Sequence, residues 1–183
     1  MSRVMEAWQQ VLRDAVSSDY DKQQFALFQI GFVLQRHNPH LTMDSDAEDE
    51  TLSRDLLRLT LNEQKQLDTV NYLVTLVHKH TAQADLFLYA LSNAQAKLLA
   101  EPLLELLVAV GNKLRPHAAY QALLAVDSII KITGDTYKSA FDTYYIVPIL
   151  DDWSDLKDEL IAKKADSVAD KIIDMLNDGD NAE

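Results

Sequence analysis

Hydrophobic residues recur every three or four positions along most of the chain, which is the spacing of an amphipathic helix. Two stretches are apolar on nearly every side and therefore predict buried helices, at residues 25–34 and within residues 97–132. The other expected helices are more one-sided and cover residues 2–16, 51–60, 60–80, 82–100, 154–164 and 166–177. This pattern predicts an all-α fold.

Residues 97–132 lie at the centre of the pattern and predict two buried helices. Leucines fill the first helix and alanines line the second, so the two can pack closely and antiparallel. Gly111 marks the turn between them, and Pro102 is expected in the first turn of the first helix. The pair is more apolar than one partner helix could cover, so we expect residues 25–34 and 67–77 to pack on its two sides.

This helix pair resembles a single HEAT-type repeat of the α-solenoid class. The resemblance rests on a proline-initiated, leucine-rich helix, a short turn, and a second helix that begins at Pro116 and continues with Ala118 and Ala119. It covers residues 97–132 and implies a scaffold or protein-binding surface without an active site. We expect a single domain of eight to ten helices in antiparallel pairs, arranged as a solenoid-like or orthogonal bundle.

The composition agrees with long helices in a self-supporting domain. Of 183 residues, 48% are hydrophobic and only 4 are glycine and 4 proline, so the chain has few sites for sharp turns. With 0 cysteines it cannot form disulfides, thiolate zinc sites, iron–sulfur clusters or a cysteine nucleophile. The first ten residues lack the apolar core of a signal peptide, and the most apolar run, Leu103–Val110, is short and contains Glu105. We therefore expect a cytoplasmic protein.

The charge is strongly negative and uneven. The formal net charge is -12, and residues 151–183 alone hold eleven acidic residues against four lysines. Such a field repels phosphate backbones and anionic lipid headgroups, which argues against direct nucleic-acid or membrane binding and favours a basic partner. The alternative is that the charge only keeps the protein in solution. We expect the helical domain to span residues 1–177, with an acidic loop at 39–50 and an acidic tail at 178–183.

An aromatic and acidic segment follows the central helix pair. Tyrosine and tryptophan beside acids are typical of recognition surfaces, although large aromatic residues also seal the end of a helical core. Both interpretations stay open from the sequence. The residues predicted to bind a partner are Tyr137, Tyr144, Tyr145, Trp153, Asp151, Asp152 and Asp155.

Candidate metal sites are weak. Alternating acids in the loop over residues 39–50 resemble the start of a calcium loop, but Asp49 stands where that loop needs glycine. His37 and His40 flank a turn and could converge, yet no third ligand is identifiable. We predict no metal and no cofactor.

The chain contains none of the common catalytic signatures, including the nucleophile elbow, the phosphate-binding glycine loops and the zinc-protease helix motif. We therefore expect a non-enzymatic protein-interaction, scaffold or adaptor module with a protein partner, and self-association is left open. One alternative is an acidic inhibitor or immunity-type protein that neutralises a basic partner or imitates nucleic acid. The other is a small-molecule-binding or catalytic helical bundle.

Overall fold

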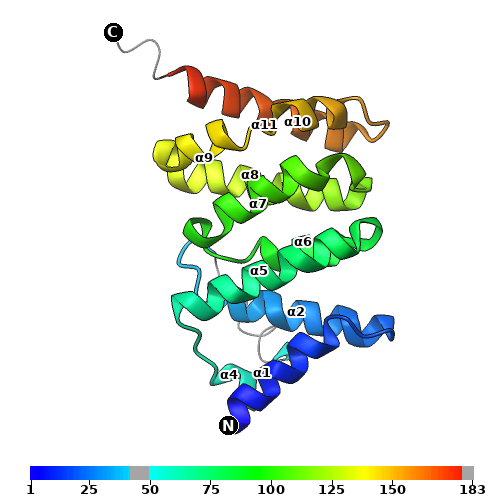
Figure 1. Ribbon diagram of the computed structural model, residues 1–183, viewed down its shortest axis with the longest axis vertical. Coiled ribbons are helices and arrows are strands. Elements are labelled where there is room, and N and C mark those ends of the chain that lie inside the picture. The colour runs from blue at the N-terminus through cyan, green and yellow to red at the C-terminus, as the bar shows by residue number, and fades with distance from the viewer. Residues whose placement is uncertain (42–49, 179–183) are drawn as a thin grey trace.

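The computed structural model describes residues 1–41 and 50–178, and every regular element in these ranges is a helix (Figure 1). This confirms the predicted all-α fold. The ten α-helices within the described ranges are α1 (Arg3–Asp14), α2 (Tyr20–Arg36), α4 (Arg54–Leu57), α5 (Glu63–Lys79), α6 (Asp85–Leu91), α7 (Ala96–Val110), α8 (Pro116–Thr133), α9 (Lys138–Thr143), α10 (Val147–Ser154) and α11 (Glu159–Asn177). Short 3₁₀ helices lie in three connections: η1 (Thr81–Gln83), η2 (Gly111–Lys113) and η3 (Gly134–Tyr137).

Parts of the two predicted acidic segments lie outside the described residues. These parts are residues 42–49 of the expected loop and residues 179–183 of the expected tail. The comparison with a calcium loop concerns the first of them and lies outside the described residues as well. Among the helices that the structure does describe, none is both long and apolar enough to span a membrane.

The helices stack on one another along the long axis of the molecule (Figure 1), and their contacts form two rows. In one row α2 packs on α6, α6 on α8, and α8 on α11; in the other row α5 packs on α7, and α7 on α9. Helices joined by short turns also pair across the rows, as α1 does with α2, α5 with α6, α7 with α8, and α10 with α11. The chain is therefore a series of antiparallel helix pairs, as the hydrophobic pattern predicts.

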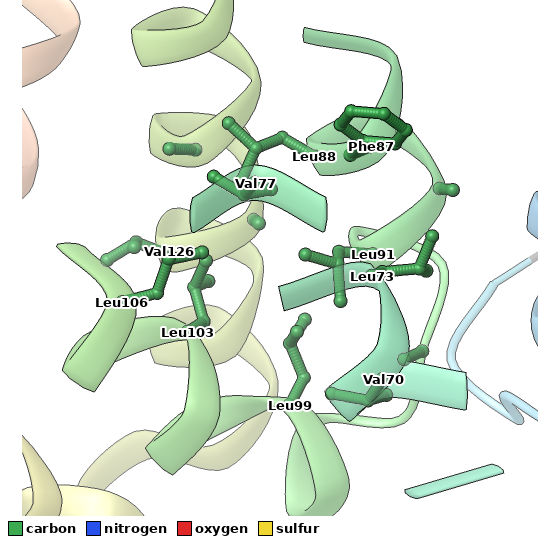
Figure 2. Packing of buried hydrophobic residues seen from close by; sticks show 14 of the residues in the cluster. Val70, Leu73, Val77, Phe87, Leu88, Leu91, Leu99, Leu103, Leu106 and Val126 are labelled. Atoms are coloured by element: carbon green, nitrogen blue, oxygen red, sulfur yellow. The ribbon is translucent and has the colours of Figure 1, made fainter. Parts of the chain in front are cut away.

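The predicted central pair is α7 and α8, and its core is continuous with the pair before it. Figure 2 shows leucine and valine side chains of α5, α6, α7 and α8 meeting in one cluster, with Phe87 of α6 beside them. On the other side, α9 packs on α7, and α11 packs on α8. The expectation that residues 67–77 pack on this pair is confirmed, because α5 packs on α7.

The expectation for residues 25–34 is wrong. These residues belong to α2, which packs against α1 and α6 instead. Helix α6 occupies the place beside α8 because Phe87, Leu88 and Leu91 form a complete apolar side of a helix within only two turns. The sequence predicts these residues as part of a longer helix over residues 82–100, but the spacing of apolar residues does not say which helix packs beside α8.

Pro102 lies well inside α7, although the sequence predicts it in a first turn. The helix begins at Ala96 and continues past the proline, giving up one intrahelical hydrogen bond. Leu99 and Leu103, on either side of Pro102, are both buried in the core. Because burial holds both halves of α7 in place, packing outweighs the local cost of the proline.

The helix expected at residues 51–60 is shorter than predicted, because a distant side chain ends it. α4 stops at Leu57, and the guanidinium of Arg36 in α2 donates hydrogen bonds to the carbonyl oxygens of Leu56, Leu57 and Leu59 at 3.0, 2.6 and 3.3 Å. These carbonyls would otherwise need a longer helix or water to satisfy them. The next helix, α5, begins at Glu63 with Asn62 as its cap.

Two glycines allow close approach between helices. A Cβ added at Gly31 would lie 3.1 Å from Nδ2 of Asn93, so α2 and the end of α6 come together at this point. The close approach gives this glycine a packing role inside a buried helix. Gly111 is tighter still, because a Cβ there would lie 2.8 Å from Cγ2 of Ile149 in α10.

We expect Gly111→Ala to lower the free energy of unfolding by about 1–2 kcal/mol, measured by urea denaturation, because the new methyl group overlaps Ile149. The same substitution in an Ile149→Ala background should cost much less, since the overlapping atoms are gone. Equal costs in the two backgrounds would show that this contact does not limit the packing of α10.

Candidate functional site

Helix α10 presents carboxyl groups to solvent from the side opposite the core. Val147, Leu150 and Trp153 occupy its buried side, and each is at most 5% exposed. Because these apolar residues recur every three positions, the other side of the helix faces outward. That side and the turn after it carry exposed Asp151, Asp152 and Asp155.

Local sequence explains where α10 begins and ends. Pro148 lies in its first turn, where a missing N–H is no loss. At the other end, the Ser154 hydroxyl donates a hydrogen bond to the carbonyl oxygen of Asp151 at 2.6 Å. The backbone N–H of Asp155 donates to the carbonyl oxygen of Asp152 at 3.3 Å. The helix is therefore short, and its last turn holds the three aspartates on a fixed backbone.

Only one of the four predicted aromatic residues is exposed. Trp153 is 4% exposed and lies in the core, and half-buried Tyr144 packs against the core. Tyr145 is 46% exposed and comes just before α10. The structure therefore removes Trp153 from the predicted binding residues, because an indole so fully buried cannot touch a partner. We call Tyr145, Asp151, Asp152 and Asp155 the α10 surface.

Tyr137 lies elsewhere in the molecule. It ends η3 and lines a groove together with Lys97, Leu98 and Pro102 of α7. Partial burial raises the pKa of its phenol, while the nearby charge of Lys97 acts in the opposite direction. Tyr137 therefore belongs to the contact between α7 and the start of α9, and the structure does not bring it to the α10 surface.

The charges of the α10 surface are available to a partner. None of the three carboxyl groups forms an ion pair or a side-chain hydrogen bond with another residue in the described ranges. Their mutual repulsion is therefore relieved only by solvent and ions. A cationic side chain placed against them would gain Coulomb energy without breaking an existing pair.

A buried carboxylate joins α8 to α11. The side chain of Asp127 is 5% exposed and accepts hydrogen bonds from three lysines. Lys131, one turn later in α8, is 2.8 Å from Oδ2, while Lys164 and Lys171 of α11 lie 2.6 Å from Oδ2 and 2.8 Å from Oδ1. We call these four residues the Asp127 cluster.

The three lysines decide the charge state of Asp127. Burial by itself would raise the pKa of this carboxyl, but the hydrogen bonds from Lys131, Lys164 and Lys171 outweigh burial and hold its pKa far below the usual value. The carboxyl is therefore ionised at neutral pH, and its buried charge is balanced by the three ammonium groups. The cluster fastens the last described helix to the rest of the stack.

Local sequence spacing suggests only one of these three pairs. Asp127 and Lys131 are four residues apart on one helix, a spacing too common to single out. Lys164 and Lys171 are 37 and 44 residues from Asp127 in the chain. Their spacing of two helical turns places both on one side of α11, and this is the only signal that could have suggested a shared partner.

The histidines near the first loop are not arranged for a metal. His37 Nε2 accepts a hydrogen bond from the N–H of Leu61 at 3.1 Å, and burial, with a smaller contribution from Arg36, lowers its pKa. Neutral His37 therefore fixes the start of α5 against the end of α2. Among the described residues, no three histidine, aspartate or glutamate side chains group closely enough to hold a metal ion.

A groove of about 280 Å³ opens where the turns of three helix pairs meet. It is lined by residues of α2, of η1 and α6, and of the start of α8, including Tyr20, Phe87, Arg115 and His117. Pockets for small ligands usually begin near 300 Å³ and enclose most of the ligand. Two hollows are much larger, about 460 Å³ between α5 and α7 and about 600 Å³ beside η3 and α9, but polar and charged residues form most of their lining. Small-ligand pockets are lined mainly by apolar residues, so none of these three hollows gives the small-molecule alternative specific support.

The described residues form an all-α protein built from stacked helix pairs. It has an acidic surface on α10 and a lysine cluster around buried Asp127. No family model, curated protein or solved structure matches the chain.

Proposed function

We propose that the protein is a non-enzymatic interaction module that binds a basic protein partner through the α10 surface. The observation that carries this proposal is the set of three exposed aspartates, each without a cationic partner among the described residues, beside half-exposed Tyr145. Tyrosine adds contact area at little entropic cost, and the carboxylates add attraction and orientation.

The stack of helix pairs supports a scaffold role. The pairs α5–α6 and α7–α8 each contribute one helix to each row, and stacked helix pairs of this kind form extended surfaces suited to binding other proteins. As part of the proposal, we extend the resemblance of residues 97–132 to a HEAT-type repeat to the whole series of helix pairs. The absence of cysteine in the sequence supports a cytosolic setting.

Binding through the α10 surface should depend strongly on salt. The three carboxyl groups are solvent-exposed, and such charges are screened over about 10 Å at 0.1 M salt. Long-range attraction mainly speeds association, so the association rate should fall most as salt increases. An apolar interface would respond in the opposite way or hardly at all.

Neutralising Asp151, Asp152 and Asp155 together with asparagine is expected to weaken capture of basic proteins from a cell extract about tenfold or more at low salt. The measurement compares bound protein at about 50 mM and about 500 mM NaCl for the variant and the natural sequence. Stability should change by less than about 0.5 kcal/mol, because the three side chains are exposed and form no ion pair with the described residues.

A charge-matched variant controls for net charge alone. Asp166, Asp170 and Asp174 are exposed residues of α11, and replacing all three with asparagine removes the same charge from a different helix. We expect this variant to keep its partners. If both variants lose the same proteins to the same extent, attraction is a property of the total charge and the α10 surface is not the binding site.

A further inference from the structure

The Asp127 cluster holds more positive charge than its carboxylate needs. Three ammonium groups surround one carboxylate, which leaves a local net charge of +2 in a chain whose formal charge is -12. One lysine of α11 would be enough to pair Asp127 and fasten the helix. Lys131 and Lys164 share the same oxygen, Oδ2, so two like charges are held next to each other.

The lysines are open to solvent while the carboxylate beneath them is not. Their side chains are 64%, 25% and 39% exposed for Lys131, Lys164 and Lys171, against 5% for Asp127. Each ammonium group has three donors and uses one of them on Asp127. The remaining donors are available on the outer side, and buried Asp127 holds the three nitrogens close together.

We propose that the Asp127 cluster is a binding site for a dianionic phosphate group, with Lys131, Lys164 and Lys171 as its donors. A tetrahedral dianion has several acceptor oxygens and the charge that balances the local excess of +2. It would lie on the solvent side, nearer to each ammonium group than to the carboxylate. Its attraction to three cations then exceeds its repulsion by Asp127.

The register of α11 adds a further donor. Ser167 is exposed and lies between Lys164 and Lys171, within one turn of each, so it is on the same side of the helix. The nearest acid by register on that side is Asp174, one turn after Lys171, and its exposed carboxylate is free to turn toward solvent. The site lies between α8 and α11, so it is separate from the α10 surface and independent of the function proposed above.

The test uses the full chain and inorganic phosphate, added at pH 8 and at constant ionic strength set with sodium chloride. Lysine side-chain signals followed by NMR should shift and saturate, with those of Lys131, Lys164 and Lys171 changing most. Lys131→Ala should weaken phosphate binding about tenfold, because it removes one charge-assisted donor. This variant should stay folded, since Lys131 is 64% exposed and two lysines remain on Asp127.

Lys163→Ala is the matched control, because Lys163 is an exposed lysine of α11 outside the cluster. Phosphate affinity should not change in this variant. The proposal is overturned if the two alanine variants weaken binding equally, or if the natural protein shows no saturation below about 50 mM phosphate. Phosphoserine is the second probe: tighter binding than free phosphate assigns the site to a phosphorylated ligand, and equal binding assigns it to the free ion.

Discussion

Replacing Trp153 with alanine is expected to lower the free energy of unfolding by about 3–5 kcal/mol, measured by urea denaturation. The indole is 4% exposed and lies on the buried side of α10, next to Leu150 and Val147. Its removal leaves a cavity between α10 and its neighbours that these short, packed helices cannot fill. Since α10 and α11 pack closely together, we expect α11 to loosen as well.

Tyr145→Ala is the matched comparison, because it removes an aromatic side chain from the same segment that is 46% exposed. Its effect on stability should stay within about 0.5 kcal/mol, while its effect on partner capture should be measurable. A Trp153→Ala protein that unfolds like the natural one would contradict the core position of this residue. The pair of variants thus separates the two interpretations of the aromatic segment.

Asp127→Asn is expected to lower the free energy of unfolding by about 2–3 kcal/mol. It leaves three lysines clustered without their counter-charge. Because the amide nitrogen of asparagine cannot accept a hydrogen bond, only the lysines at the remaining oxygen keep theirs, and those bonds are weaker. Breaking a fully buried pair costs about 3–5 kcal/mol, but Lys131 and Lys171 can turn into water, which reduces the cost here. Thermal unfolding and proteolysis near α11 would both report the loss.

The same cluster predicts how stability depends on pH. The pKa of Asp127 is lowered on folding because the hydrogen bonds from its three lysines outweigh its burial. Its contribution is therefore fully present above the unfolded pKa of about 4 and is lost as pH falls below that value. Between pH 5 and pH 2 the natural protein should lose stability more steeply than Asp127→Asn, so the two should converge.

Asp174→Asn is the control for this pH experiment. Asp174 is an exposed acid of α11 that forms no ion pair with the described residues. Its replacement should therefore leave the loss of stability between pH 5 and pH 2 unchanged. If Asp127→Asn keeps its full difference from the natural protein at pH 2, the cluster does not act through the ionised carboxylate. The stabilising role would then come from packing alone.

The two proposals place opposite charges at different points of the same end of the stack. The α10 surface is negative and belongs to the helix that pairs with α11, whereas the Asp127 cluster carries the local excess of lysine between α11 and α8. A basic partner and a phosphate group could therefore bind at the same time. Because α11 contacts both α10 and α8, Asp127→Asn also tests whether loosening α11 changes capture at the α10 surface.

The sequence by itself determined the class of fold and most helix positions. Periodic apolar residues identify helices because a helix must bury one side, and this signal is local and dense in a chain with 4 glycines and 4 prolines. The buried pair α7 and α8 and the acidic segment after it could both be predicted from the sequence. Pro102 was misplaced because its local preference was outweighed by the burial of its neighbours.

Only the tertiary structure decided which predicted binding residues face solvent and which distant charges meet. Trp153 and Tyr145 look alike as aromatic neighbours of acids, and their different exposure depends on the direction in which α10 packs. Asp127 meets Lys164 and Lys171 because the antiparallel pairing places α11 on α8, a relation that no local spacing contains. Helix formation depends on neighbours within one or two turns, whereas these sites depend on how whole helices stack.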